Sequence, residues 1–281
     1  MPEALWPAPA KLNLFLHVLG QTASGHHRIQ TLYQLLDWGD TLTIEATDAD
    51  RIMQRAPVPG IAPDQDLCLR AARLLKQETG SNKGAVIGLH KSIPLGAGLG
   101  GGSSDAATVL LVLNRLWGCG LSTESLAELG LSLGADVPLF VHGHTAWGEG
   151  IGERLLPMEL GESWYVLVLP DLEVSTAEVF HDPALNRNTR PIDPTGFEMA
   201  NSRNDCEAVV LERYPLLRTV VADLGKWGAP RMSGTGSCFF LPVRDEIRAS
   251  EVTHALKSRY NVRAVRGVDQ SALLAKLSGA G

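Results

Sequence analysis

The sequence predicts an α+β protein of two domains, the first over residues 1–155 and the second over residues 156–281. Three observations support this fold class. Strand and helix patterns alternate along the first half, and the glycine cluster at residues 148–152 is the clearest internal break. Beyond it, a buried strand pattern opens a second series of helices and strands, which predicts a small α/β sandwich. A chain of 281 residues is also long enough for two modest domains.

The individual elements follow from hydrophobic periodicity and from capping residues. The predicted strands, each a run of alternating or continuous apolar residues, cover residues 11–19, 40–46, 84–91, 164–169, 238–243 and 262–267. The predicted helices, each with apolar residues at helical spacing, cover residues 66–77, 106–117, 123–133, 205–214 and 246–259. Asp66 is a favourable N-cap for the first helix, and the proline-rich segment 182–197 predicts a surface loop.

The composition is that of an ordinary globular protein, with 44% hydrophobic and 20% charged residues. A net charge of −6 argues against non-specific nucleic-acid binding and favours a small-molecule partner. The four cysteines show no C-x-x-C spacing, and no apolar run reaches the ~18 residues of a membrane span. We therefore expect a soluble, unexported protein in the reducing cytoplasm, as a monomer or a homodimer.

The most informative segment is the glycine-rich run PLGAGLGGGSSDAAT at residues 94–108. Its glycines tolerate positive φ and let the backbone approach a ligand, so several N–H groups can face an anion. Ser103 or Ser104 is a suitable N-cap for the helix that follows, whose free N–H groups and dipole favour a bound phosphate. A plain connector is the alternative, but connectors are usually shorter, and the segment predicts a phosphate-binding loop.

Three known phosphate-binding loops can be compared with this segment. A P-loop requires Lys directly after its last glycine, where this chain has Ser103. Gly96, Gly98 and Gly101 satisfy G-x-G-x-x-G, but Pro94 interrupts the strand that a dinucleotide site needs. The protein-kinase motifs H-R-D and D-F-G are absent from the sequence. None of the three accounts for the segment.

Three further features each have a structural and a functional interpretation. Lys11 and Asn13 share one face of the first predicted strand, either as a solvated face or as a cation and an amide that meet a polar substrate. Asp136 follows a predicted helix and precedes Pro138, so it either caps the next short helix or acts in catalysis. The glycine-rich turn at residues 231–238 is, taken alone, more typical of a connector. The residues alone leave these alternatives open.

The pattern P-x-G-x-G-L-G-(G)-G-S-S-x-A at residues 94–106 resembles the second motif of the GHMP kinases. Further landmarks of this family follow in order, at residues 9–16, 25–27, 133–138, 204–206 and 233–236. The resemblance implies a ribosomal-protein-S5-like N-terminal domain, a ferredoxin-like C-terminal domain and an active site between them. It also implies ATP and Mg²⁺ as cofactors and a small-molecule alcohol as the phosphate acceptor.

The resemblance also implies residue roles. Asp136 matches the general base that takes a proton from the attacking hydroxyl, Lys11 matches the cation beside it, and Asn13 would orient the substrate. The residues expected at the nucleotide are Lys91, Pro94, Gly96, Gly98, Gly100, Gly101, Gly102, Ser103, Ser104, Gly234, Thr235 and Gly236. No separate protein metal site is expected, since Mg²⁺ arrives with ATP, near Ser103 or Ser104. A solvated lysine at a strand end is the alternative for Lys91.

The landmarks resemble a branch of the family whose substrate carries a cytidine diphosphate. Its members have a tyrosine that stacks on cytosine, opposite a phenylalanine that aligns with Phe180. This chain has His26 in place of the tyrosine, and we expect weaker and more pH-sensitive substrate binding, because imidazole is smaller and titrates near neutral pH. His27 matches a base-contacting histidine, and Thr176 aligns with a residue near the substrate phosphates. Asp66 stands where Asn is usual, which leaves a contact to the nucleotide open.

Three alternatives remain at this point. Another GHMP kinase would act on an alcohol such as mevalonate or homoserine, which has no base to stack on Phe180. A nucleotide-binding relative that has lost catalysis would not need both Lys11 and Asp136. A dinucleotide oxidoreductase would use Gly96, Gly98 and Gly101 and would change nicotinamide fluorescence on titration.

Overall fold

The computed structural model describes residues 4–22 and 25–279. In this part of the chain, ten strands form one sheet, whose main path is β3-β4-β2-β10-β7-β9-β8; β1 and β5 also pair with β2, and β6 pairs with β5. The strands are β1 (Leu5–Gln21), β2 (His27–Thr47), β3 (Ile52–Gln54), β4 (Gly84–His90), β5 (Ala146–Glu149), β6 (Arg154–Pro157), β7 (Ser163–Val168), β8 (Arg231–Met232), β9 (Phe239–Val243) and β10 (Val262–Val268). The helices are α1 (Leu67–Thr79), α2 (Gly101–Trp117), α3 (Thr123–Leu131), α4 (Val137–His142), α5 (Thr176–His181), α6 (Glu207–Arg213), α7 (Leu217–Gly225), α8 (Glu246–Leu256) and α9 (Ala272–Gly279).

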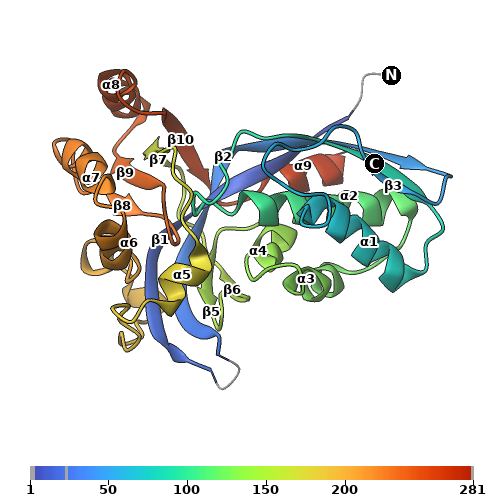
Figure 1. The fold of residues 1–281 in the computed structure, drawn as a ribbon, viewed down its shortest axis with the longest axis horizontal. Coiled ribbons are helices and arrows are strands. Elements are labelled where there is room, and N and C mark those ends of the chain that lie inside the picture. The colour runs from blue at the N-terminus through green and yellow to red at the C-terminus, as the bar shows by residue number, and fades with distance from the viewer. Residues whose placement is uncertain (1–3, 23–24, 280–281) are drawn as a thin grey trace.

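Two groups of helices lie at opposite ends of the molecule, and the long strands β1 and β2 run between them (Figure 1). Helices α1 to α4 and α9 lie at one end, whereas α6, α7 and α8 lie at the other, beside β8 and β9. Strands β1 and β2 are antiparallel, with pairs that extend from Leu5 and Thr43 to Gln21 and His27. The hairpin of β1 and β2 therefore contributes strands to the sheet at both ends of the molecule.

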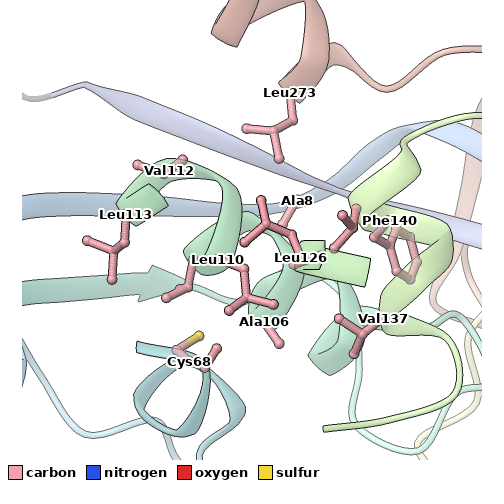
Figure 2. Packing of buried hydrophobic residues seen from close by; sticks show 14 of the residues in the cluster. Ala8, Cys68, Ala106, Leu110, Val112, Leu113, Leu126, Val137, Phe140 and Leu273 are labelled. Atoms are coloured by element: carbon pink, nitrogen blue, oxygen red, sulfur yellow. The ribbon is translucent and has the colours of Figure 1, made fainter. Parts of the chain in front are cut away.

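The first hydrophobic core forms where helices α1 to α4 pack on β1, β2 and β4. Leu110 of α2, Leu126 of α3 and Val137 of α4 belong to one cluster of buried side chains (Figure 2). Leu273 points from α9 toward the same cluster. A helix from the C-terminal part of the chain thus completes the core that the N-terminal part begins.

The second core forms where α6, α7 and α8 cover the sheet at the other end. Val210, Leu224 and Val252 from these helices pack with Val168 of β7 and Leu241 of β9. This arrangement confirms the predicted α+β class and its small α/β sandwich.

Strand β10 connects the two ends. Its residues 262–267 pair with β7, and Gly267 and Val268 pair with Leu36 and Leu35 of β2. The predicted domain boundary near residue 155 falls within β6, which pairs with β5. That boundary stays a prediction.

The helix predicted over 106–117 begins earlier than expected, at Gly101, so its predicted start is wrong. Its N-cap is Gly100, with φ of +72°, whereas Ser103 and Ser104 lie in the first turn. A glycine cap has no side chain to accept from the first helical N–H groups, which leaves these groups available to a ligand. Each of the other predicted helices and strands overlaps an observed one. The predicted loop at 182–197 also contains a single 3₁₀ turn at Pro194–Gly196.

Candidate active site

A cavity of about 820 Å³ is lined by residues from both halves of the chain. It brings together most of the predicted site residues, namely Lys11, Asn13, His26, His27, Lys91, Pro94, Gly96, Gly98, Gly100, Gly101, Gly102, Ser103, Asp136, Thr176, Phe180, Gly234 and Thr235. Two predicted residues lie outside this lining. Ser104 is fully buried and its hydroxyl has no partner among the described residues, and Gly236 does not belong to the cavity lining.

The glycine loop adopts backbone conformations that require glycine. Gly96, Gly98 and Gly100 have φ of +63°, +73° and +72°, in the left-handed region that other residues rarely adopt. Gly98 also meets a close neighbour, because a Cβ there would stand 2.2 Å from the Ser233 carbonyl oxygen. The loop leads into the N-terminus of α2 at Gly101, which lines the cavity. Free N–H groups and the helix dipole at this point favour an anionic ligand.

The glycine-rich turn at 231–238 packs directly on this loop. The N–H groups of Ser237 and Cys238 donate to the carbonyl oxygens of Gly96 and Ala97, both at 3.2 Å. The Ser233 hydroxyl donates to Gly98 O at 2.9 Å. The second turn is therefore a wall of the site as well as a connector. The sequence pattern alone could not show this, because the two turns lie far apart in the chain.

Lys11 and Asp136 form an ion pair inside the cavity, with 3.3 Å between Nζ and Oδ2. Lys11 Nζ also donates to Asn13 Oδ1 and, at 3.1 Å, to Gly98 O. Lys11 and Asn13 are 3% and 2% exposed, so the solvated face considered for this strand is wrong. The reason is that β1 is covered on both faces, and these two side chains bond to each other and to buried neighbours such as Gly98 and Thr31 instead of to water.

Asp136 occupies the N-cap position of α4 but accepts no capping hydrogen bond. Its other oxygen, Oδ1, accepts from the Tyr33 hydroxyl at 3.2 Å. Burial and the nearby Asp136 charge raise the pKa of Tyr33 well above its usual value, so the phenol remains a donor at neutral pH. Tyr33 was missed from the sequence because no element was predicted over the first half of β2.

A second charged cluster lies where β4 leads into the glycine loop. Lys91 Nζ contacts Asp40 Oδ2 at 2.5 Å and Asp105 Oδ2 at 2.9 Å. Asp40 Oδ1 also accepts from the N–H groups of Ser92 and Ile93, at 2.5 and 2.8 Å. Burial opposes the Lys91 charge, but the two carboxylates raise its pKa. Lys91 thus lines the cavity as a paired cation and is not the solvated lysine of the alternative interpretation.

Within this cluster, the ionised form of Asp105 is disfavoured by its surroundings. Burial, together with the Asp40 charge, raises its pKa to about 7, against the opposing effect of Lys91. Its second oxygen, Oδ1, is buried and has no partner in the described part of the chain. Asp105 belongs to the S-S-D-A-A run, which is the signal that could have identified it.

Asp66 caps α1 as predicted. Its Oδ1 accepts from the N–H groups of Cys68 and Leu69, at 2.8 and 3.2 Å, and its Oδ2 accepts from Gln54 at 2.7 Å. Both oxygens are engaged, although the residue also lines the cavity.

An aromatic pair lies at another part of the cavity wall. The rings of His27 and Phe180 stack with 5.1 Å between their centroids and 27° between their planes. Burial and the positive charges of Arg187, His181 and His26 lower the pKa of His27. Thr176, at the start of α5, shares a hydrogen bond of 2.9 Å with Thr235 of the second glycine turn.

In the described residues, no group of three or more His, Cys, Asp or Glu side chains is arranged to hold a metal ion. None of the helices in that same part of the chain has the length and apolar character needed to cross a membrane.

Two family models match the chain: the N-terminal domain of GHMP kinases over residues 66–144 and the C-terminal domain of GHMP kinases over residues 190–262. The 4-diphosphocytidyl-2-C-methyl-D-erythritol kinase of Alkalilimnicola ehrlichii is 48% identical to 98% of this chain, over 94% of its own length. The enzyme of the same name from Pseudomonas syringae is 46% identical, over 98% of both chains.

Solved structures agree with this relationship. A crystal structure of 4-(cytidine 5'-diphospho)-2C-methyl-D-erythritol kinase superposes with a TM-score of 0.83, at 32% identity, over 94% of this chain and all of that one. A homoserine kinase from Cytophaga hutchinsonii shares the fold, with a TM-score of 0.69 at 15% identity, over 96% of this chain and 95% of its own. Similarity over nearly the whole length shows that the chain belongs to the 4-diphosphocytidyl-2-C-methyl-D-erythritol kinase family of the GHMP kinases.

Proposed function

We propose that the protein transfers the γ-phosphoryl group of ATP to the 2-hydroxyl of 4-diphosphocytidyl-2-C-methyl-D-erythritol, giving the 2-phosphate and ADP. This reaction would serve the non-mevalonate route to isopentenyl diphosphate, in the cytoplasm. The observation that carries the proposal is the Lys11–Asp136 ion pair of 3.3 Å in the same cavity as the glycine loop. Membership of the family supports the choice of substrate.

Phosphoryl transfer depends mainly on positioning and on stabilisation of charge. The N–H groups of the glycine loop and of the first turn of α2 would hold the ATP phosphates. Asp136 would take the proton from the attacking hydroxyl, while Lys11 stabilises the negative charge that develops on that oxygen. Tyr33 and Asn13 hold this pair in place through the contacts described above.

Mg²⁺ is proposed as the partner of ATP, because it neutralises the phosphate charge. Ser103 fits such a role best, since it lines the cavity in the first turn of α2 and offers the type of oxygen that Mg²⁺ prefers. Ser104 fits less well, since its hydroxyl is fully buried outside the cavity lining.

The cytidine end of the substrate is proposed to bind at His26, His27 and Phe180, with Thr176 near the diphosphate. Aromatic side chains at the cavity wall suit a flat base, and mevalonate or homoserine would make no use of them. Two GHMP kinases of that type share only the fold with this chain, at 14–15% identity.

The test is ADP release from Mg-ATP with 4-diphosphocytidyl-2-C-methyl-D-erythritol, mevalonate or homoserine as the acceptor. We expect turnover with the first compound alone. Turnover with another acceptor would contradict the substrate, and no turnover with any of the three would favour a nucleotide-binding relative without catalysis.

The substitution Asp136→Asn removes the base and keeps the shape of the side chain. We expect kcat to fall by about 10²- to 10⁴-fold, while the affinity for ATP stays nearly unchanged. The matched control is Asp245→Asn, at the N-cap of α8 outside the cavity, where Asn caps as well as Asp. Near-normal turnover in Asp136→Asn would show that another group accepts the proton.

A further inference from the structure

Arg187 lies in the segment predicted as a plain surface loop, where no site residue was expected. Its guanidinium is held by three backbone carbonyl groups near the end of α5. Nη2 donates to Phe180 O and Asp182 O, both at 2.7 Å, and Nη1 donates to Leu185 O at 3.1 Å. The remaining nitrogen, Nε, donates to Nε2 of His27 at 3.0 Å. These backbone contacts therefore hold the guanidinium in the orientation in which Nε donates to His27.

The hydrogen bond between Arg187 and His27 can have only one direction. A guanidinium has N–H donors and no acceptor, and it stays protonated in proteins. His27 Nε2 must therefore accept, and a neutral imidazole that accepts at Nε2 carries its hydrogen on Nδ1. Among the described residues, Nδ1 has no protein partner, so this N–H is available to a ligand in the cavity that His27 lines.

Other contacts support the same state of the ring. Stacking on Phe180 restrains rotation of the imidazole. The groups that lower the pKa of His27, burial first and then the charges of Arg187, His181 and His26, keep it neutral at pH 7. Geometry and electrostatics therefore both favour the neutral tautomer with hydrogen on Nδ1.

We propose that Arg187 is a positioning residue, which fixes His27 as a hydrogen-bond donor at Nδ1 and thereby makes the site select cytosine over uracil. The proposal rests on the proposed function, since it concerns the base of that substrate. Ring atom N3 is an acceptor in cytosine and carries a hydrogen in uracil. A histidine fixed as a donor at Nδ1 can bind cytosine N3. With uracil, the N–H of the histidine would face the N–H of the base, and no hydrogen bond could form, which lowers the affinity. Without Arg187, the imidazole can exchange tautomers and serve either base.

The first measurement is the two-bond ¹H–¹⁵N correlation spectrum of the histidine rings in the ligand-free protein, with His27 assigned by its loss in His27→Asn. We expect a protonated Nδ1 and an unprotonated Nε2 in the wild type. In Arg187→Met we expect a mixture of the two tautomers.

The second measurement is the affinity for CDP and for UDP, together with KM and kcat for the substrate. We expect the wild type to prefer CDP, and Arg187→Met to lose about tenfold of this preference, as one hydrogen bond suggests. The loss should fall on KM more than on kcat. The matched control is Arg213→Met: this arginine also anchors α5, through Glu178 and Asp182, but in the described part of the chain it makes no contact with His27. It should keep both the tautomer and the CDP preference.

A wild-type His27 that is protonated at Nε2 overturns the proposal, and so does an unchanged CDP preference in Arg187→Met or an equal loss in Arg213→Met. The tautomer is measured without ligand and does not depend on the proposed function. A protein with the expected tautomer that binds neither CDP nor UDP contradicts the proposed function, and the role in base selection falls with it. If Arg187→Met does not fold, Arg187→Lys, which keeps the charge but lacks Nε, is expected to show the same mixture of tautomers.

Discussion

Asp136 shows how one residue can satisfy a structural pattern and still serve chemistry. It stands at the N-cap position of a short helix before Pro138, as a capping aspartate would. Its carboxylate instead meets Lys11 and Tyr33 and binds no N–H group of α4. Capping and catalysis could not be separated in the sequence, because the partners that decide between them lie more than a hundred residues away.

Asp105 should make the free energy of unfolding depend on pH in the opposite direction from an ordinary paired carboxylate. Its pKa is raised to about 7, so between about pH 4 and pH 7 the folded protein holds a proton that the unfolded chain has lost. The free energy of unfolding should therefore fall as pH rises through this window. Asp105→Asn cannot ionise, and its stability relative to wild type should improve by about 2 kcal/mol between pH 5 and pH 8.

Urea unfolding of both proteins at pH 5 and pH 8 measures this difference. Asp223→Asn is the control, because hydrogen bonds from Lys226 and Tyr260 lower the pKa of Asp223. The stability contribution of Asp223 is lost only in acid, as pH falls toward its lowered pKa, so its substitution should show no change between pH 5 and pH 8. A constant difference between wild type and Asp105→Asn would mean that Asp105 is ionised throughout this range.

At the scale of single elements, the phosphate-binding loop was recognisable in the sequence but the start of its helix was not. Hydroxyl residues are the usual N-caps, which favoured Ser103 or Ser104. The observed cap, Gly100, has no side chain to bind the first N–H groups of α2. A serine cap would have used donors that a phosphate needs, so the ligand site and the ordinary capping rule conflict here.

Strand β2 shows a different limit. Gln30, Thr31 and Gln34 are of polar types that usually lie at the surface of proteins, yet all three are buried. Gln34 Nε2, for example, donates to Thr145 Oγ1 at 3.1 Å and to Val268 O at 3.0 Å. Because both faces of the strand are covered, polar and apolar residues do not alternate between water and core, and the period-two signal is lost.

Gly98 and Gly118 form a matched pair for testing the loop. Their φ values are similar, +73° and +70°. A Cβ added at Gly98 would lie 2.2 Å from the Ser233 carbonyl oxygen, whereas a Cβ added at Gly118 would have no atom within 4 Å. We expect Gly118→Ala to cost about 1 kcal/mol through backbone strain alone. Gly98→Ala should cost about 3 kcal/mol or more, because the second glycine turn must also move.

Thermal unfolding and ATP titration distinguish the two variants. Only Gly98→Ala should weaken ATP binding, since Gly118 lies at the far end of α2. Equal stability losses in both would show that the contact between the two glycine turns adds nothing beyond strain.

At the scale of the whole molecule, the sequence predicted the fold class and most of the residues that the structure brings together around the cavity, because the family motifs fall in order along the chain. It did not predict which segments meet. Helix α9 packs on β1, and β10 bridges β2 and β7. A short helix such as α9 has too few residues to show a clear hydrophobic period in the sequence. Its position depends on which apolar surface the other elements leave uncovered.

Leu273 tests how much α9 contributes. Its side chain is 1% exposed in the first core, so Leu273→Ala should lower the free energy of unfolding by about 2–5 kcal/mol. Leu216→Ala is the control, since that side chain is 74% exposed and its loss should change stability by less than about 0.5 kcal/mol. Denaturant unfolding measures both, and a negligible effect at Leu273 would mean that α9 is dispensable for this core.

The contact of α9 with β1 also bears on how the protein is made. Lys276 Nζ donates to the carbonyl oxygen of Leu5, a residue translated 271 positions earlier, and Arg115 donates to the carbonyl oxygen of Leu277. The first core therefore cannot close while its earliest strand is emerging from the ribosome. The apolar surface beneath α9 therefore stays exposed on the nascent chain until α9 itself has been synthesised, and this is the interval in which the surface can aggregate.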